Sequence, residues 1–352
     1  MKNIFKSIHR DNIHPILAKL FLFEYWPVNV VYFPAFIYWL YLSLRARSFT
    51  YFVATNPGLE NGGLFGASKE KTLSFISEEH KPRTMHVDAT MEYSAFLEVF
   101  NESAFLFPII CKPDEGERGY MVKKVFSFDE LEAYYKNAKG NFIIQDYIHF
   151  PEEYGVLFYR YPSGKKGITS FTTKRFLSVI GDGTSNVEQL LKKSTRARMQ
   201  LSRLAQEKPK LLKHIPAENE RVVVEPIGNH CKGTEFIDVC HLINEQLIDT
   251  FDKITKPING FYYGRFDLKV TSLEDLYQGK NIRILELNGT NSEAIHIYSK
   301  EMNILKAYRN IFQNMKIVFE IAMEIKSKGI TSPSVFLTAQ KVYRYFNSRK
   351  KS

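Results

Sequence analysis

Two apolar segments in the last third of the chain carry charged and amide side chains at alternate positions. The segments are residues 262–270 and 282–288, each about the length of one strand. The first contains Arg265 and Asp267, and the second contains Glu286 and Asn288. Side chains alternate between the two faces of a strand, so each pair lies on one face. If the segments are neighbouring strands, the four polar side chains converge on one side of an otherwise apolar sheet.

The chemistry of this group points to a metal ion. Carboxylate and amide oxygens are ligands that Mg²⁺ accepts, and Mg²⁺ usually completes its shell with water and nucleotide phosphates. We therefore predict Asp267, Glu286 and Asn288 as metal ligands, with Mn²⁺ as an alternative ion. Arg265 beside them would stabilise negative charge on a transferring phosphoryl group. The simpler alternative is a surface hairpin in which the arginine and the carboxylates form a salt bridge.

A second group of candidate residues lies in a compact α+β unit upstream. The pattern predicts strand, turn, strand, helix and strand over 107–113, 115–119, 121–125, 129–138 and 141–147 respectively. Lys112 closes the first strand and would meet a phosphate as a point charge. The turn glycines, Gly116 and Gly119, would let backbone N–H groups fold over phosphates. A Gly-x-x-Gly turn alone is not specific, and the sequence contains no Walker-type loop.

The last strand of this unit leads into a segment that suits a nucleoside. Gln145 and Ile148 lie at a hinge whose backbone would read an adenine edge. Just beyond the hinge, Glu152 and Glu153 are placed to accept hydrogen bonds from ribose hydroxyls.

The order of these elements resembles the ATP-grasp superfamily, which includes D-alanine–D-alanine ligase. The shared features are a lysine-ending strand, a glycine turn, a hinge strand followed by an acid, and then Arg-x-Asp and Glu-x-Asn, over about residues 105–300. Two further stretches are similar to the ATP-grasp module of cyanophycin synthetase. They are Val179–Glu188, with Gly-Asp-Gly at 181–183, and Asn229-His230 with Gly233.

The resemblance implies a role for each candidate residue. It assigns ATP binding to Lys112, Gly116, Gly119, Gln145, Ile148, Glu153 and Lys174, metal binding to Asp267, Glu286 and Asn288, and catalysis at the acyl-phosphate transition state to Arg265 and Lys174. Within the ATP set, the two lysines would bind phosphates, the hinge residues adenine, and Glu153 the ribose. Glu153 is preferred to Glu152 because an apolar strand follows it directly, and Glu152 stays the alternative.

The same resemblance implies the fold class and the activity. The class is α+β: an ATP-grasp fold of two α+β lobes clamping ATP, preceded by an aromatic-rich helical N-terminal region. The activity would be ATP- and Mg²⁺-dependent ligation of a small-molecule carboxylate to an amine, or to a thiol, through an acyl phosphate. Two alternatives are a kinase-like ATP-grasp phosphotransferase and a membrane-associated nucleotide-binding protein without ligase activity.

The chain departs from the family pattern in two places. The hinge begins with Gln145, where the family usually has glutamate, although the amide of Gln145 can still bond adenine. Family members usually begin with a Rossmann-like substrate domain, and residues 1–104 are too short and too aromatic for one. A glycine- and asparagine-rich loop in that region either shapes the substrate side or only forms turns. Its candidate residues are Asn56, Gly63, Ser68 and Lys69.

The N-terminal region contains a run of twenty residues without a charge, Tyr25–Leu44, of which eight are aromatic. A single membrane span is disfavoured because Pro34 interrupts the run and basic residues flank its N-terminal side. A helix lying in the membrane interface, or a re-entrant pair broken at Pro34, fits better. The alternatives are a buried helix and a homodimer contact.

Charge and cysteine content narrow the partners and the compartment. The 48 Lys and Arg residues exceed the 38 Asp and Glu residues by 10, which favours anionic partners. The basic stretch Lys192–Lys213 lacks interleaved aromatic residues, so nucleic acid is not an expected partner. Three scattered cysteines suit neither a disulfide framework nor a zinc site. We therefore expect a cytoplasmic protein, free or peripheral on the cytoplasmic membrane face.

These patterns divide the chain into five parts. They are an aromatic segment (1–48), a substrate-side region (49–104), a small lobe (105–150), a large lobe with the metal site (151–330) and a basic tail (331–352). Further helices are predicted over 72–80, 91–102, 186–204, 238–255 and 303–326, and further strands over 154–161, 169–179 and 221–227.

Overall fold

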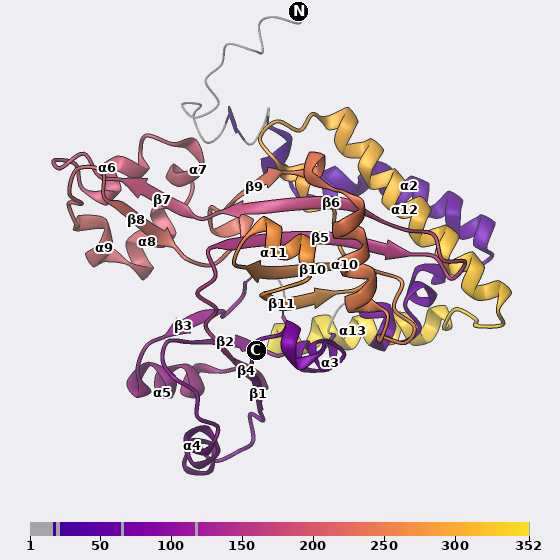
Figure 1. Ribbon diagram of the computed structural model, residues 1–352, viewed down its shortest axis with the longest axis horizontal. Coiled ribbons are helices and arrows are strands. Elements are labelled where there is room, and N and C mark those ends of the chain that lie inside the picture. Colours follow the sequence, from indigo (N-terminus) through magenta and orange to yellow (C-terminus); the bar gives the residue numbers. More distant parts are fainter. Residues whose placement is uncertain (1–16, 19–21, 65–66, 117–118, 352) are drawn as a thin grey trace, which may run out of the picture.

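The computed structural model describes residues 17–18, 22–64, 67–116 and 119–351 (Figure 1). Within these ranges the strands form antiparallel sheets of four, five and two strands. Helices cover the two larger sheets, so the α+β class expected from the sequence is confirmed. The four-stranded sheet forms a small lobe below the five-stranded sheet in Figure 1.

The small lobe is a four-stranded sheet with two helices packed on one face. The strand order is β1 (Thr84–Val87), β4 (Phe142–Asp146), β2 (Ile109–Pro113) and β3 (Lys123–Val125), and the helices are α4 (Tyr93–Glu102) and α5 (Phe128–Asn137). Alternate residues of β2, Ile109 and Cys111, join Phe96 and Phe142 in its core. Because Lys112 directly follows Cys111, its side chain leaves from the opposite face of the strand.

The large lobe is built on a five-stranded sheet with an apolar cluster on each face. Its order is β11 (Ile282–Asn288), β10 (Tyr263–Val270), β5 (Glu152–Arg160), β6 (Lys166–Arg175) and β9 (Glu235–Asp238). The helices α10 (Glu245–Thr255) and α11 (Leu273–Gln278) cover one face, where Phe158 packs near Phe251. The neighbouring residue Leu157 belongs to the cluster on the other face, with α12 (Ile304–Ser327) and α2 (Val28–Ala46).

A third, smaller unit spans residues 177–225, and two sequence-based expectations for this region are wrong. The strand expected over 169–179 divides between β6 and β7 (Leu177–Ile180), and β7 pairs with β8 (Arg221–Glu225) in a separate two-stranded sheet. The helix expected over 186–204 is broken into α6 (Val187–Leu191), α7 (Thr195–Arg198) and α8 (Leu201–Glu207), followed by α9 (Pro209–Lys213). Each short helix buries a few apolar residues in one local cluster, which a straight helix of that length would not reach.

Two other helices begin at positions that their capping residues explain. The helix expected over 238–255 begins only at Glu245, because Asp238 ends β9 and the Asn244 side chain accepts from Leu247 N. The helix expected over 72–80 is α3 (Lys69–Ser74), which begins after Ser68, whose side chain accepts from Lys71 N.

Most of the N-terminal aromatic run forms one helix, α2, which continues through Pro34. Of the two forms expected, the re-entrant pair broken at Pro34 is therefore wrong. Proline removes one backbone donor from the helix, and packing on both sides of it compensates. Val31 and Ala35 are buried around Pro34, and Leu42 and Ala46 are buried further along. In the part of the chain that the structure describes, no helix combines the length and the apolar character needed to cross a bilayer.

The basic tail also forms a helix, α13 (Val335–Lys351). It lies beneath the five-stranded sheet, near α3, in Figure 1. Lys341 Nζ donates to Asn61 Oδ1 at 2.6 Å. The tail is therefore attached to the N-terminal region at this point.

Candidate functional site

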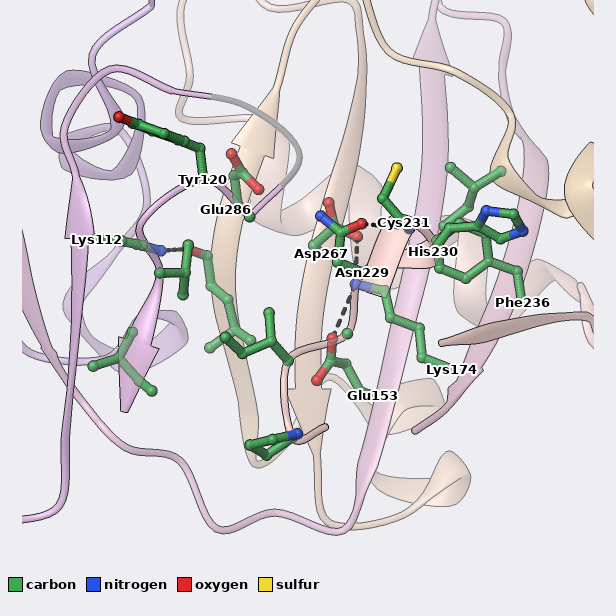
Figure 2. A pocket seen from close by; sticks show the side chains of 18 of the residues that line it. Lys112, Tyr120, Glu153, Lys174, Asn229, His230, Cys231, Phe236, Asp267 and Glu286 are labelled. Atoms are coloured by element: carbon green, nitrogen blue, oxygen red, sulfur yellow. Dashed lines mark hydrogen bonds and ion pairs between the residues drawn. The ribbon is translucent and has the colours of Figure 1, made fainter. Parts of the chain in front are cut away.

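A cavity of about 680 Å³ is lined by residues of both lobes (Figure 2). Every residue that the resemblance assigns to ATP binding, metal binding or catalysis lines it, except Asn288. Those from the small lobe and the hinge are Lys112, Gly116, Gly119, Gln145 and Ile148, and those from the large lobe are Glu153, Lys174, Arg265, Asp267 and Glu286.

The strands β10 and β11 pair as the sequence predicts. In their register Arg265 lies opposite Asn288, and Asp267 lies opposite Glu286. Two carboxylates directly opposite each other on one face repel unless cations lie near them. Asn288 does not reach the cavity wall, but its Nδ2 donates to Asp267 Oδ2 at 3.2 Å.

A β-bulge between β10 and β11 frees a backbone carbonyl that a lysine of the small lobe contacts. The register moves from Asp267 opposite Glu286 to Leu268 opposite Ile284, so Leu285 has no partner on β10. Its carbonyl oxygen instead accepts a hydrogen bond of 2.9 Å from Lys112 Nζ of the small lobe. Burial lowers the pKa of Lys112 to about 8, although the Glu286 carboxylate opposes that shift.

Lys174 lies between two carboxylates at the centre of the cavity wall. Its Nζ is 2.9 Å from Glu153 Oε1 and 3.0 Å from Asp267 Oδ1, and all three side chains are buried (Figure 2). Burial alone would lower the pKa of Lys174, but the carboxylates of Asp267 and Glu153 raise it well above its usual range. The ammonium group is therefore charged throughout the physiological pH range.

Arg265 supplies a second cation to the same aspartate. Its Nε and Nη2 donate to Asp267 Oδ2 at 3.1 and 3.0 Å, and its Nη1 donates to the carbonyl of Glu293. Burial would raise the pKa of Asp267, but Arg265 and Lys174 hold that pKa at about 2. Asp267 is therefore a carboxylate at every pH at which the protein would work.

The surroundings of Glu286 show whether a cation fits this side of the cavity. Among the described residues, none forms a hydrogen bond or an ion pair with its carboxylate, although it lines the cavity opposite Asp267. A half-buried carboxylate beside a second carboxylate is the donor set that Mg²⁺ uses together with nucleotide phosphates. The residues present fit a divalent cation held mainly by Glu286, with Asp267 sharing its oxygens between the ion and its two basic neighbours.

The glycine turn closes over the cavity from the small lobe. Gly119 has a φ of +69°, and a Cβ atom there would lie 2.8 Å from Asn229 Nδ2 in the large lobe. Lys69 Nζ donates to the carbonyl of Gly116 at 2.8 Å and to that of Asp114 at 3.2 Å. The two middle residues, 117 and 118, lie outside the described part of the chain. Lys69 thus holds one end of the turn, while only a glycine fits at the other.

The hinge end of the cavity contains the residues predicted for adenine and ribose. Gln145 is buried and its Nε2 donates to Thr84 Oγ1 at 3.0 Å, which directs the amide nitrogen toward β1. Glu153 lines the cavity, whereas Glu152 lies outside the lining residues and accepts a hydrogen bond from the Tyr154 hydroxyl. Of the two glutamates left open by the sequence, Glu153 is the one that faces the cavity.

The far half of the cavity contains residues that sequence reasoning missed. Glu24, Tyr25 and Trp26, just before α2, line it together with Arg196 of α7. Arg196 Nη2 donates to a carboxylate oxygen of Glu24, which ties the N-terminal segment to the small third unit. No local spacing marks this pair, because its members are 172 residues apart.

His230 adds an unusual polar group to the far half. Its ring lies between those of Phe236 and Tyr298, at centroid distances of 5.3 and 5.7 Å. Its Nε2 is buried and has no hydrogen-bond partner within the described ranges. Burial, with a contribution from Arg196, lowers the pKa of His230 to about 3, so the ring is neutral. Buried polar atoms are usually satisfied, so Nε2 is a candidate contact for a bound molecule.

Several sequence candidates have structural partners instead. Of the four loop residues, only Lys69 lines the cavity. Asn56 joins three backbone segments, since its Nδ2 donates to the carbonyls of Tyr263 and Gly62 and its Oδ1 accepts from Tyr263 N. Ser68 caps α3, and Gly63 packs against the backbone of Gly289.

Two other motifs lie away from the cavity. In the Gly-Asp-Gly stretch, Asp182 accepts hydrogen bonds from Thr184 N and Ser185 N and so forms the turn before α6. His296 is satisfied by Ser170, with 2.7 Å between Nδ1 and Oγ. His296, Cys240 and Asp238 form a cluster in which one potential metal-ligand atom of each residue lies within 4.8 Å of the others. Each of the three side chains already forms a hydrogen bond with another protein group.

The chain was compared with protein families, curated sequences and solved structures, and only solved structures are similar to it. No protein-family model matches the chain, and no curated protein sequence does. Three of the similar solved structures are D-alanine–D-alanine ligase from Bacillus anthracis (14% identity, TM-score 0.41), the VanG D-Ala:D-Ser ligase from Enterococcus faecalis (12%, 0.40) and a bifunctional glutathione synthetase from Pasteurella multocida (16%, 0.35).

The overlap with these structures is partial. The similar regions cover 75%, 74% and 70% of this chain, and 69%, 60% and 35% of the respective solved chains. With TM-scores below 0.5, they decide nothing about the chemistry, which depends on the residues described above. The similarity to the D-alanine–D-alanine ligase structure extends over 75% of this chain.

Proposed function

We propose that the protein is an ATP- and Mg²⁺-dependent ligase that joins a small-molecule carboxylate to an amine through an acyl phosphate. The observation that carries the proposal is that three basic side chains and two opposed carboxylates line one cavity between the two lobes. Lys112, Lys174 and Arg265 supply the cations, and Asp267 and Glu286 supply the carboxylates. Phosphoryl transfer depends mainly on positioning and charge stabilisation, and this arrangement provides both.

The proposed first step transfers the terminal phosphoryl group of ATP to the acid. A carboxylate oxygen of the substrate forms a bond to the γ-phosphorus while the bond from that phosphorus to ADP breaks. Arg265 and Lys174 offset the negative charge that spreads over the phosphoryl oxygens. Mg²⁺, when held by Glu286, Asp267 and the neighbouring Asn288, would neutralise phosphate charge there.

The proposed second step releases inorganic phosphate. The amine nitrogen forms a bond to the carbonyl carbon of the acyl phosphate, the bond to the phosphate oxygen breaks, and the nitrogen loses a proton. A thiol is an alternative nucleophile. The far half of the cavity, with Glu24, Arg196 and His230, is the space that remains for these substrates once a nucleotide occupies the hinge half.

Hydroxylamine trapping separates this proposal from its rivals. Hydroxylamine replaces the natural amine at an acyl phosphate and yields a stable hydroxamate. The expected result with ATP, Mg²⁺ and a panel of carboxylic acids is a hydroxamate in equal amount to ADP. A phosphorylated product that resists hydroxylamine would instead identify a kinase-like phosphotransferase. ATP binding without ADP formation on any acid, with or without amines, would favour a nucleotide-binding protein without ligase activity.

The pKa of Lys112 predicts a pH dependence of nucleotide binding. Because the free protein holds that pKa at about 8, the ammonium form is lost as the pH rises above it. If the charged form binds phosphate, ATP affinity should fall up to about tenfold per pH unit above that point. Calorimetric titrations in buffers of different ionisation enthalpy should also detect proton uptake on binding there. Lys112→Arg, which stays charged, should remove both effects, and an unchanged pH profile in this variant would contradict the role of Lys112.

A further inference from the structure

The helix α2 has two apolar faces, and the described residues cover only one of them. The covered face consists of Val31, Ala35, Leu42 and Ala46, which belong to the cluster shared with α12. The opposite face is an exposed apolar stripe of Val30, Phe33, Phe36, Ile37, Leu40 and Leu44, which we name the outer stripe. Apart from the adjacent Phe36 and Ile37, its members follow one another at three- and four-residue intervals, so they form one continuous ridge. Phe33 is 64% exposed and Leu44 is 70% exposed.

A ridge of this kind indicates a binding surface. Proteins that remain free in water rarely expose contiguous apolar patches of this type, and such patches mark sites for partners or membranes. The helix does not need the outer stripe for its own packing, because α12 and its neighbours already cover the inner face. Fold stability therefore gives no reason for these residues to be large and apolar.

The charges around the outer stripe indicate what covers it. Arg45 and Arg47 are exposed at the end of α2. The exposed Lys326 joins them, because its Nζ donates to the carbonyl of Ala46 at 2.9 Å. Residues 25–48 contain no acidic side chain, and the whole chain has a net charge of +10.

We propose that the outer stripe docks on an anionic lipid surface, with α2 lying in the plane of the headgroups. Aromatic residues favour the headgroup level, apolar side chains enter the acyl boundary, and basic residues at the helix end meet anionic lipid. A second copy of the chain is a poorer occupant. A two-fold interface must be complementary to itself, and α2 offers no acid to pair with the arginines of its copy.

Docking in this way has a consequence for the cavity. The segment Glu24–Trp26, which lines the far half of the cavity, precedes α2 by one residue. The far half of the cavity would then lie next to the membrane surface. This consequence depends on no assumption about the reaction, and lipid binding can be measured without nucleotide.

Vesicle co-sedimentation of the full-length protein tests the proposal. Wild type should sediment with vesicles of phosphatidylcholine mixed with phosphatidylglycerol and bind phosphatidylcholine alone more weakly. The double variant Phe33→Gln/Leu44→Gln should lose about tenfold or more in vesicle affinity, since both side chains leave the apolar boundary. Arg45→Glu should weaken binding about tenfold to the anionic vesicles only. Leu106→Gln is the matched control, because Leu106 is 79% exposed in the small lobe.

Three outcomes would overturn the proposal. They are no sedimentation of wild type with anionic vesicles, equal sedimentation of wild type and the double variant, and equal losses in the double variant and Leu106→Gln. Light scattering identifies the alternative occupant: a dimer that becomes a monomer in the double variant would assign the outer stripe to a second copy. Thermal unfolding of each variant confirms that a loss of lipid binding is not a loss of fold.

Discussion

Replacing Lys174 by methionine should destabilise the protein by about 3–5 kcal/mol, because the substitution leaves buried carboxylates without their cation. Glu153 loses the ion pair at 2.9 Å, and Asp267 keeps only Arg265. The methionine fills a similar volume, so the effect reports charge and not a cavity. The pKa of Lys174 is raised above its unfolded value, so its stabilisation is complete below the unfolded pKa and is lost only at strongly alkaline pH. The cost should therefore be the same from about pH 6 to pH 9.

The same strand offers a matched control for this prediction. Lys166 also contacts two carboxylates, Asp249 at 2.8 Å and Asp252 at 2.9 Å, but its side chain is 30% exposed. Lys166→Met should cost no more than about 1 kcal/mol, as exposed ion pairs usually do. Urea unfolding of both variants measures the difference. An equal loss of unfolding free energy at the two positions would show that burial does not determine how much the Glu153–Lys174–Asp267 group stabilises the fold.

The parts of the site that could be predicted are those in which polar residues interrupt an apolar strand. Arg265 and Asp267 stand two apart in an apolar segment, as do Glu286 and Asn288, and strand periodicity alone places each pair on one face. Lys112 was visible for a related reason, as a charge near the end of the apolar strand β2. Pairing of β10 with β11 then brings Arg265, Asp267 and Glu286 to one cavity, which Lys112 joins from the small lobe, whereas Asn288 lies outside the cavity lining.

The parts that could not be predicted depend on contacts between distant segments. β1 is four residues long and mostly half-buried, so its pattern is too short to read before it pairs with β4. The bulge that frees the Leu285 carbonyl is a change of register within a continuous apolar run. Lys69 resembled an ordinary loop residue, and its contact with the glycine turn arises only when two separate loops meet.

The N-terminal aromatic run shows that one apolar sequence pattern can produce both a buried and an exposed face of a helix. Its low charge and many aromatic residues suggested either a membrane contact or a buried helix, and α2 has one buried face and one exposed apolar face. Hydropathy summed along the run does not separate the faces, because apolar residues surround the helix on all sides. Only the position of α12 shows which of them are covered.

Replacing Glu286 by glutamine should abolish ATP turnover while leaving the fold as stable as wild type or more stable. The carboxylate has no hydrogen bond or ion pair from the described residues and faces Asp267 across the strand pair. Its removal therefore relieves a like-charge contact and costs no protein partner. If Glu286 holds the metal ion, phosphate release should fall about a hundredfold or more.

Two measurements and a control variant separate this explanation from general damage. The unfolding temperature should not fall, and the Mg²⁺ concentration for half-maximal ATP binding should rise. Glu98→Gln, at an exposed position on α4, should match wild type in both assays.

A loss of turnover at an unchanged Mg²⁺ requirement would show that Glu286 acts on the substrate and not on the ion. Retained turnover would mean that the opposed carboxylates only shape the cavity wall. Among the described residues Asp267 has two basic partners and Glu286 has none. The Glu286 charge is stable only if its cost is small or a ligand offsets that cost, and this variant decides between the two.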